Sequence, residues 1–127
     1  MKRIFVLEDD IACAVLIIAT LKHLAPTALV VHAESIAQAK SLLITEDRET
    51  PLFGLAILDF NVPDGNGTEL VGLIRERFPG CSVCMHSGQI PWDLAAMTEM
   101  QRVAPDEMLA KPAKMDDYRK ILRRAGM

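Results

Sequence analysis

Aromatic residues are scarce in this chain: they make up 5% of its 127 residues, although 50% of the residues are hydrophobic. A core of this composition must consist of aliphatic side chains, chiefly Leu, Ile, Val, Ala and Met. A chain of this length buries roughly two-thirds of the surface that its unfolded form exposes, so one domain can be stable without a disulfide or a metal. We therefore expect a single domain over residues 1–127.

Long apolar runs and targeting signals are also missing. The apolar stretch at residues 11–21 is too short to cross a bilayer, which needs about 20 residues. Only four apolar residues follow Arg3 before acidic residues begin, so the N-terminus does not resemble a signal peptide. Three cysteines, an odd number, do not make a disulfide framework and suit a reducing compartment. We expect a cytoplasmic protein that does not bind membranes.

Charge of one sign is not concentrated anywhere in the sequence. The net charge is −3, and no long run of acidic or basic residues occurs. Nucleic acids and anionic membranes both require a concentrated basic surface. The basic cluster near the C-terminus predicts the solvated face of a helix and consists of Arg119, Lys120, Arg123 and Arg124. We therefore predict no nucleic-acid binding.

Short apolar runs alternate with amphipathic segments along the chain. The predicted strands are residues 4–7, 28–31, 52–58, 81–85 and 107–110, and the predicted helices are residues 11–24, 35–45, 66–78, 91–103 and 116–125. Two helix starts carry a capping signal, Ser35 with Gln38 and Asn66 with Glu69. Strands that alternate with helices form parallel β-α-β units, so we predict an α/β fold with helices on both faces of an open sheet.

Polar residues follow four of the five predicted strands. The first strand is followed by Glu8, Asp9 and Asp10, the third by Asp59, the fourth by His86 and Ser87, and the fifth by Lys111. In an open parallel sheet, ligands bind beyond the carboxyl ends of the strands. Each residue alone has a simpler explanation as a helix cap or a turn residue. Their joint position at one rim predicts a functional site.

The chemistry of this rim predicts a magnesium ion and a phosphoryl group. Carboxylates that lie close together repel, so a cation is needed to keep them ionised. Mg²⁺ is a hard cation that prefers oxygen ligands and keeps several waters. With the cation present, Asp59 can act as a nucleophile toward phosphorus, as carboxylates do when they form aspartyl-phosphates. Lys111 and Ser87 would then contact the phosphoryl oxygens.

These motifs make the chain similar to the receiver domains of two-component response regulators. The matching elements are Val6-Leu7-Glu8-Asp9-Asp10, Leu58-Asp59 with Pro63 and Gly67, Ser87-Gly88 and Lys111-Pro112. The resemblance covers essentially the whole chain. It implies a flavodoxin-like (CheY-like) doubly wound sheet of five parallel strands in the order 2-1-3-4-5.

The resemblance also implies a role for each residue of the rim. Asp59 would be the phosphoacceptor, Ser87 the switch hydroxyl and Lys111 the ammonium that contacts the phosphoryl group. The Mg²⁺ ligands would be Asp9 and Asp59 directly, Asn61 through its backbone carbonyl, and Glu8 through water. The phosphoryl donor would be a sensor histidine kinase or a histidine phosphotransfer protein.

Three residues near the C-terminus depart from the family pattern. Met108 stands where receivers usually carry Tyr or Phe, Ala113 where they carry Phe, and Lys114 where a capping Ser or Asp is common. The aromatic residue rotates inward on activation in the family, and Met108 cannot reproduce that rotation. The phosphorylation chemistry looks intact, whereas its relay to the rest of the molecule is nonstandard.

We predict a stand-alone receiver that signals through contacts with an unknown downstream protein, because no residues follow the last helix to form an output domain. It would catalyse only its own phosphorylation and dephosphorylation, and a weak homodimer is compatible with the pattern. One alternative is a receiver-like interaction module that works without phosphorylation. Another is a phosphohydrolase, disfavoured because Asn61 stands where such enzymes place a second Asp as acid/base.

Three further features have competing interpretations. Cys81 and Cys84 lie within one predicted strand and point to opposite faces, so we interpret them as core thiols rather than a redox pair or metal ligands. The apolar residues on all sides of helix 11–24 indicate either a partner surface or additional packing. The apolar residues of helix 91–103, among them Trp92, Leu94 and Met97, fit either a binding face or a core stripe.

Overall fold

The computed structural model describes residues 2–45, 52–88 and 93–127. Its strands are β1 (Arg3–Leu7), β2 (Leu29–Ala33), β3 (Phe53–Asp59), β4 (Asn61–Val62), β5 (Gly65–Asn66), β6 (Ser82–Ser87) and β7 (Glu107–Ala110). Its helices are α1 (Ile11–Leu24), α2 (Ile36–Ile44), the 3₁₀ helix η1 (Gly67–Leu70), α3 (Val71–Arg77), α4 (Leu94–Val103) and α5 (Met115–Arg124). The predicted elements are therefore all present, with ends displaced by a few residues.

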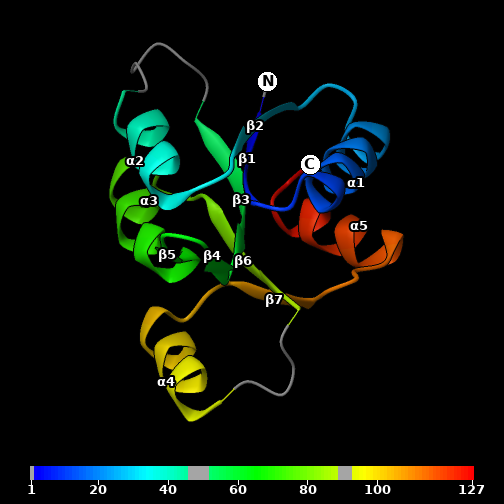
Figure 1. Cartoon of the computed structure of the whole chain (residues 1–127). Coiled ribbons are helices and arrows are strands. Elements are labelled where there is room, and N and C mark those ends of the chain that lie inside the picture. The colour runs from blue at the N-terminus through cyan, green and yellow to red at the C-terminus, as the bar shows by residue number, and fades with distance from the viewer. Residues whose placement is uncertain (1, 46–51, 89–92) are drawn as a thin grey trace.

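Five parallel strands form the central sheet in the order β2-β1-β3-β6-β7. When the short β4–β5 hairpin is left out of the count, this order is the predicted 2-1-3-4-5. Figure 1 shows α1 and α5 on one face of the sheet and α2, α3 and α4 on the other. The fold is the flavodoxin-like, CheY-like α/β fold that the resemblance implied.

Each face of the sheet has its own aliphatic core. On the face of α1 and α5, Ile4, Val6 and Ile57 pack with residues of both helices. On the opposite face, Phe5 and Leu58 belong to the core beneath the other three helices. Consecutive strand residues enter different cores because side chains alternate across a strand. The central strands are thus apolar throughout, as predicted for a sheet covered on both faces.

Polar side chains cap three of the helices. Asp10 accepts the N–H of Cys13 at 2.9 Å and begins α1, and Asp93 accepts the N–H of Ala96 at 2.8 Å and begins α4. At α2, the Ser35 hydroxyl accepts the N–H of Gln38 at 3.1 Å. These bonds satisfy N–H groups that have no partner inside the helix.

The α2 cap differs from the prediction in one bond. In the expected capping box, Gln38 reaches back to the N–H of Ser35. The Gln38 side chain instead accepts the N–H of Glu34, at 2.8 Å. The structure therefore confirms Ser35 as the cap and corrects the partner of Gln38.

Two segments have more regular structure than the sequence indicated. Residues 61–65 lie between a predicted strand and a predicted helix, but together with Asn66 they form the antiparallel β4–β5 hairpin, in which Asn61 pairs with Asn66. The fourth sheet strand was predicted to end at residue 85, but β6 continues through His86 and Ser87. Pairing with β3 and β7 extends that strand, and neither partner can be seen from the local sequence.

The structure resolves some of the competing interpretations. Cys81 and Cys84 are buried in the two different cores, and burial raises the pKa of each thiol to about 12, so both are core thiols as predicted. In α4, Leu94 is 80% exposed and Met97 is 50% exposed, so the core-stripe interpretation is wrong for these two residues. Trp92 lies outside the described residues.

Helix α1 is apolar on two faces, and only one of them is in the core. Ile17 and Leu21 are buried against the sheet. Ile11, Val15 and Leu16 are 62%, 60% and 69% exposed. The outward face is therefore an apolar surface and not additional packing within the described chain. No helix in the described ranges is long and apolar enough to cross a membrane.

Candidate functional site

The predicted rim residues gather at the carboxyl ends of the central strands. Glu8 and Asp9 follow β1, Asp59 is the last residue of β3, Ser87 the last of β6, and Lys111 follows β7 directly. β1 lies between β2 and β3, so the chain winds outward in opposite directions from the β1/β3 pair. This switch point is where open α/β sheets bind their ligands.

Three carboxylates form the centre of the site. Glu8, Asp9 and Asp59 each offer one oxygen, and these oxygens lie within 4.8 Å of one another. Glu8 is 1% exposed and Asp59 is 6% exposed, whereas Asp9 is exposed. A set of hard carboxylate oxygens, open to solvent on one side, fits a magnesium ion that keeps part of its water shell.

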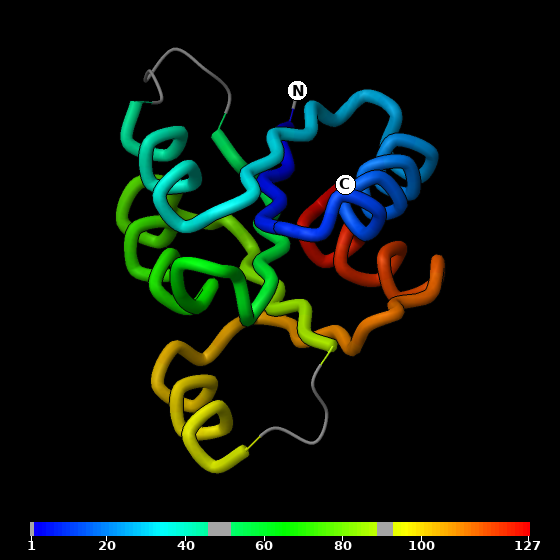
Figure 2. Tube along the Cα trace, viewed as in Figure 1, coloured from blue at the N-terminus to red at the C-terminus, as the bar shows by residue number. Residues whose placement is uncertain are grey.

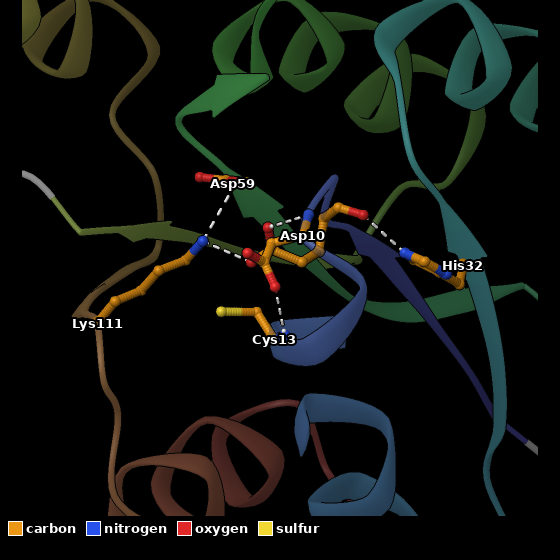
Figure 3. A network of polar contacts seen from close by, with 6 residues as sticks. Asp10, Cys13, His32, Asp59 and Lys111 are labelled. Carbon is orange, nitrogen blue, oxygen red and sulfur yellow. Dashed lines mark hydrogen bonds and ion pairs between the residues drawn. The ribbon is translucent and has the colours of Figure 1, made fainter. Parts of the chain in front are cut away.

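Lys111 supplies the positive charge inside this cluster. Its Nζ lies 2.5 Å from Glu8 Oε1 and 3.2 Å from Asp59 Oδ2 (Figure 3). The backbone of Lys111 is held as well, because its N–H donates to the carbonyl of Ser87 at 2.9 Å. Lys111, which follows β7, therefore connects Glu8 after β1 with Asp59 at the end of β3, and these three strands are far apart in the sequence.

Burial and neighbouring charges shift the pKa values of Asp59, Glu8 and Lys111. Burial and the neighbouring Glu8 carboxylate together raise the pKa of Asp59 to about 7, although Lys111 acts to lower it. Burial also acts to raise the pKa of Glu8, but the hydrogen bonds that Glu8 makes, together with the charge of Lys111, outweigh burial and leave that pKa below its usual value. The two carboxylates raise the pKa of Lys111 despite its burial. Without a metal, Asp59 holds a proton more readily than Glu8 does.

Backbone bonds hold Glu8 in place, and one of them involves a residue that the sequence did not suggest. The Glu8 N–H donates to Ala33 O at 3.0 Å, and Asp10 N–H donates to the Glu8 carboxylate at 3.2 Å. His32 Nε2 lies 2.8 Å from the Glu8 carbonyl oxygen (Figure 3). In the sequence, His32 is visible only as a polar residue directly after the predicted strand 28–31. Its position opposite Val6, close to Glu8, results from the pairing of β1 with β2.

The segment after Asp59 turns tightly enough to require glycine. Gly67 N–H donates to Phe60 O at 3.0 Å, which closes the hairpin behind the acceptor. A Cβ on Gly67 would lie 2.2 Å from the backbone oxygen of Asp59, a distance that no side chain can occupy. Asn61, the first residue of β4, lies in this hairpin. The predicted metal-binding carbonyl is thus in a short, constrained segment next to the acceptor.

Ser87 lies beside the acceptor strand. β6 pairs with β3, with Asp59 opposite His86, so Ser87 is one position beyond the acceptor along the sheet. The side chain is 1% exposed. Phe60 N–H donates to His86 O at 3.1 Å and extends the pairing past Asp59. The rim residues predicted from the sequence thus lie at or just beyond the carboxyl ends of β1, β3, β6 and β7.

A doubly wound parallel sheet with acidic residues and a lysine at its strand ends defines a signalling domain of the CheY-like class. The chain belongs to the response regulator receiver domain family, which its sequence matches over residues 4–123. Members of this family are signalling modules of two-component systems rather than conventional enzymes.

One curated relative is the photosynthetic apparatus regulatory protein RegA of Cereibacter sphaeroides. It is 27% identical over 94 residues, which cover 74% of this chain and 47% of that protein. The match therefore spans about half of the relative's length. The activity and partners of the whole relative are not transferred by that match.

Solved structures with the same fold come from archaea and bacteria. A CheY-like receiver domain of Methanospirillum hungatei superposes with a TM-score of 0.80 at 24% identity, covering 99% of this chain and 94% of that one. The response regulator TrrA of Thermotoga maritima, solved with Mg²⁺ and BeF, has a TM-score of 0.76 at 21% identity and coverages of 98% and 99%. At these identities the similarity establishes the fold.

Proposed function

We propose that this domain accepts a phosphoryl group on Asp59 in a Mg²⁺-dependent reaction, and that residues 1–127 form one receiver domain. The observation that supports this proposal best is the charge arrangement. Three carboxylate oxygens lie within 4.8 Å, and one lysine bridges two of the carboxylates. The donor would be a phosphohistidine on a sensor histidine kinase or a histidine phosphotransfer protein.

In the proposed reaction, a carboxylate oxygen of Asp59 attacks phosphorus as the P–N bond to the donor histidine breaks. The nitrogen keeps the electron pair of that bond, and the product is an aspartyl-phosphate. Glu8, Asp9, Asp59 and the Asn61 carbonyl would hold Mg²⁺, which supplies positive charge against the phosphoryl oxygens. The ammonium of Lys111 is already 3.2 Å from Asp59 Oδ2 and would stabilise the same oxygens.

Ser87 is proposed to report the phosphorylated state. Its hydroxyl is at the end of β6, next to the acceptor strand, and can donate a hydrogen bond to a phosphoryl oxygen that arrives at Asp59. A movement of Ser87 would be transmitted to β7, because the Ser87 carbonyl accepts the N–H of Lys111. This route is proposed to carry the signal to a downstream protein.

The decisive experiment is phosphorylation by acetyl phosphate. We expect wild-type protein with Mg²⁺ to gain one phosphoryl group, and no gain with EDTA or in Asp59→Asn. Intact-mass spectrometry measures the addition, and beryllofluoride binding measured by calorimetry gives a second readout. Equal phosphorylation of Asp59→Asn would exclude Asp59 as the acceptor, and no phosphorylation of the wild type would contradict the proposal.

A second candidate is a receiver-like module that binds a partner without phosphorylation. Met108, at the position of the usual aromatic, is 51% exposed on the edge strand β7 and does not fill an inward pocket. That observation favours a nonstandard readout. The acetyl phosphate experiment separates the two functions, since the module would bind its partner equally well as wild type and as Asp59→Asn. The phosphohydrolase alternative is disfavoured by Asn61.

Output is proposed to occur through protein contacts in the cytoplasm, without nucleic-acid or membrane binding. The exposed apolar residues of α4 and β7, namely Leu94, Met97 and Met108, offer a surface for a downstream protein or a weak homodimer. Light scattering over a range of concentrations, with and without beryllofluoride, tests for the homodimer.

A further inference from the structure

The β4–β5 hairpin that follows the acceptor strand is tied at its tip to a helix from another part of the chain. Asp64, in the turn of the hairpin, accepts the N–H of Ile36 at 2.8 Å with one carboxylate oxygen and the N–H of Ala37 at 3.0 Å with the other. Both N–H groups belong to the first turn of α2. Figure 2 shows the green hairpin segment beside the cyan start of that helix.

This link is not the ordinary cap of α2. Ser35 already caps the helix, since its hydroxyl accepts the N–H of Gln38. Asp64 satisfies two other N–H groups from 28 and 27 residues away. A carboxylate at a helix N-terminus is also favoured by the helix dipole. The two backbone hydrogen bonds lower the pKa of Asp64, so the link is charged at neutral pH.

The hairpin is short, and Val62 in its first strand packs against the core beneath α2, α3 and α4. Each of its strands is two residues long, and Asn66 N–H donates to Glu69 Oε2 at 2.9 Å. Gly65, the first residue of β5, adopts φ 152°, and a Cβ there would lie 2.1 Å from Glu69 Oε2. The tip is therefore tight, and the bonds from Asp64 join it to α2. Isolated two-stranded hairpins are only marginally stable in water.

We propose that Asp64 is a positioning residue for the metal site: by holding the hairpin to α2, it orients the backbone of Asn61 for cation binding. Asn61 begins the same hairpin, three residues before Asp64 and two after Asp59. The inference rests on the proposed function, in which the Asn61 carbonyl is a Mg²⁺ ligand. It assigns to α2, a helix that contributes no predicted ligand, a role in metal affinity.

The experiment compares Asp64→Ala with Ser35→Ala in otherwise intact protein. Both variants remove a side-chain cap from α2, but only Asp64→Ala releases the hairpin. We expect Mg²⁺, titrated by calorimetry, to bind Asp64→Ala roughly tenfold more weakly than wild type, the low end for residues that orient metal ligands. Ser35→Ala should bind Mg²⁺ with an affinity within about twofold of wild type, although its Tm should fall by about as much as the Tm of Asp64→Ala.

Two further readouts keep the test decisive. Asp64 is exposed, so its variants should fold. Asp64→Asn keeps one carbonyl acceptor, so its affinity for Mg²⁺ should lie between those of wild type and Asp64→Ala. In ¹⁵N-labelled wild type, Mg²⁺ should shift the amide signals of Ile36 and Ala37, and the shift should vanish in Asp64→Ala. We expect this shift because coupling is reciprocal: if the contact between Asp64 and α2 affects Mg²⁺ binding, then Mg²⁺ binding must affect that contact.

Each contrary result is distinguishable. Unchanged Mg²⁺ affinity in Asp64→Ala, with a wild type that binds Mg²⁺ and is phosphorylated, would overturn the role of Asp64 and leave the proposed function intact. An equal loss of affinity in Ser35→Ala would show that helix stability, and not the position of the hairpin, is responsible. A wild type that does not bind Mg²⁺ would overturn both proposals.

Discussion

Asp59 is buried beside Glu8, and the ionisation of this pair of carboxylates depends on both their burial and their neighbours. Two neighbouring carboxylates with little access to water resist full ionisation. Lys111 compensates for one negative charge, which is why the pKa of Glu8 falls while that of Asp59 rises to about 7. The charge that Lys111 leaves uncompensated is the electrostatic basis for a cation at this site.

The raised pKa of Asp59 predicts a pH-dependent effect of Asp59→Asn on the stability of metal-free protein. Well below pH 4 the carboxyl group is protonated in both the folded and the unfolded state, so it does not change the free energy of unfolding. Between about pH 4 and pH 7 the folded state retains a proton that the unfolded state loses, so the contribution of Asp59 to the free energy of unfolding falls as pH rises. Asp59→Asn should therefore be more stable than wild type by roughly 4 kcal/mol at pH 8, and this difference should shrink steadily toward zero as the pH falls below about 4.

Urea unfolding in EDTA across that pH range measures the difference. Asp116→Asn is the control, since the Asp116 side chain is 77% exposed and its loss should matter little at any pH. A stabilisation by Asp59→Asn that is the same at pH 5 and pH 8 would contradict the assignment of the raised pKa to Asp59.

At the scale of elements, α1 has two apolar faces that differ in burial. Ile17 is 4% exposed and packs in the core with Leu21 and β1, whereas its neighbour Leu16 is 69% exposed. Sequence periodicity could not separate the two faces because both are apolar. The outward face is an exposed apolar surface that is available to a partner.

Substitutions at these two neighbouring residues of α1 should change the free energy of unfolding by very different amounts. We expect Ile17→Ala to lower the free energy of unfolding by about 2–5 kcal/mol, because it removes buried methyl groups and leaves a cavity. Leu16→Glu should change it by less than about 0.5 kcal/mol, because the side chain is in water. Urea unfolding measures both, and a large loss in Leu16→Glu would show that the outward face is covered by another part of the protein or by a second copy.

For the whole molecule, the carboxylate cluster exists only in the folded state, because β1 and β3 supply its members from positions about 50 residues apart. Mg²⁺ that binds the cluster must therefore stabilise the fold. At a concentration one hundred times its Kd, the ion should add about 2.7 kcal/mol to the free energy of unfolding.

Thermal unfolding in MgCl₂ and in NaCl of equal ionic strength tests this prediction. We expect a higher Tm in MgCl₂ for wild type and no difference for Asp9→Asn, which lacks one carboxylate of the cluster. An increase of the same size in Asp9→Asn would place the stabilising cation elsewhere on the protein.

Much of this architecture follows from local patterns. Apolar runs and capping residues predict five strands and five helices, and the polar residues at the strand ends predict the rim of the site. Strand order is not a local property, and it was available only through the resemblance carried by Asp9, Asp59 and Lys111. The extension of β6 to Ser87 and the β4–β5 hairpin were missed because both depend on pairing with distant or returning backbone.

Strand ends are marked by where apolar residues stop, so local sequence specifies which chemical groups lie at the carboxyl ends of the strands. The interactions between those groups depend on how the whole chain folds. Lys111 bridges Glu8 and Asp59, His32 holds the Glu8 backbone, and Asp64 joins the hairpin to α2. These contacts join residues between 24 and 103 positions apart, and such distances are bridged only when strands pair and helices pack.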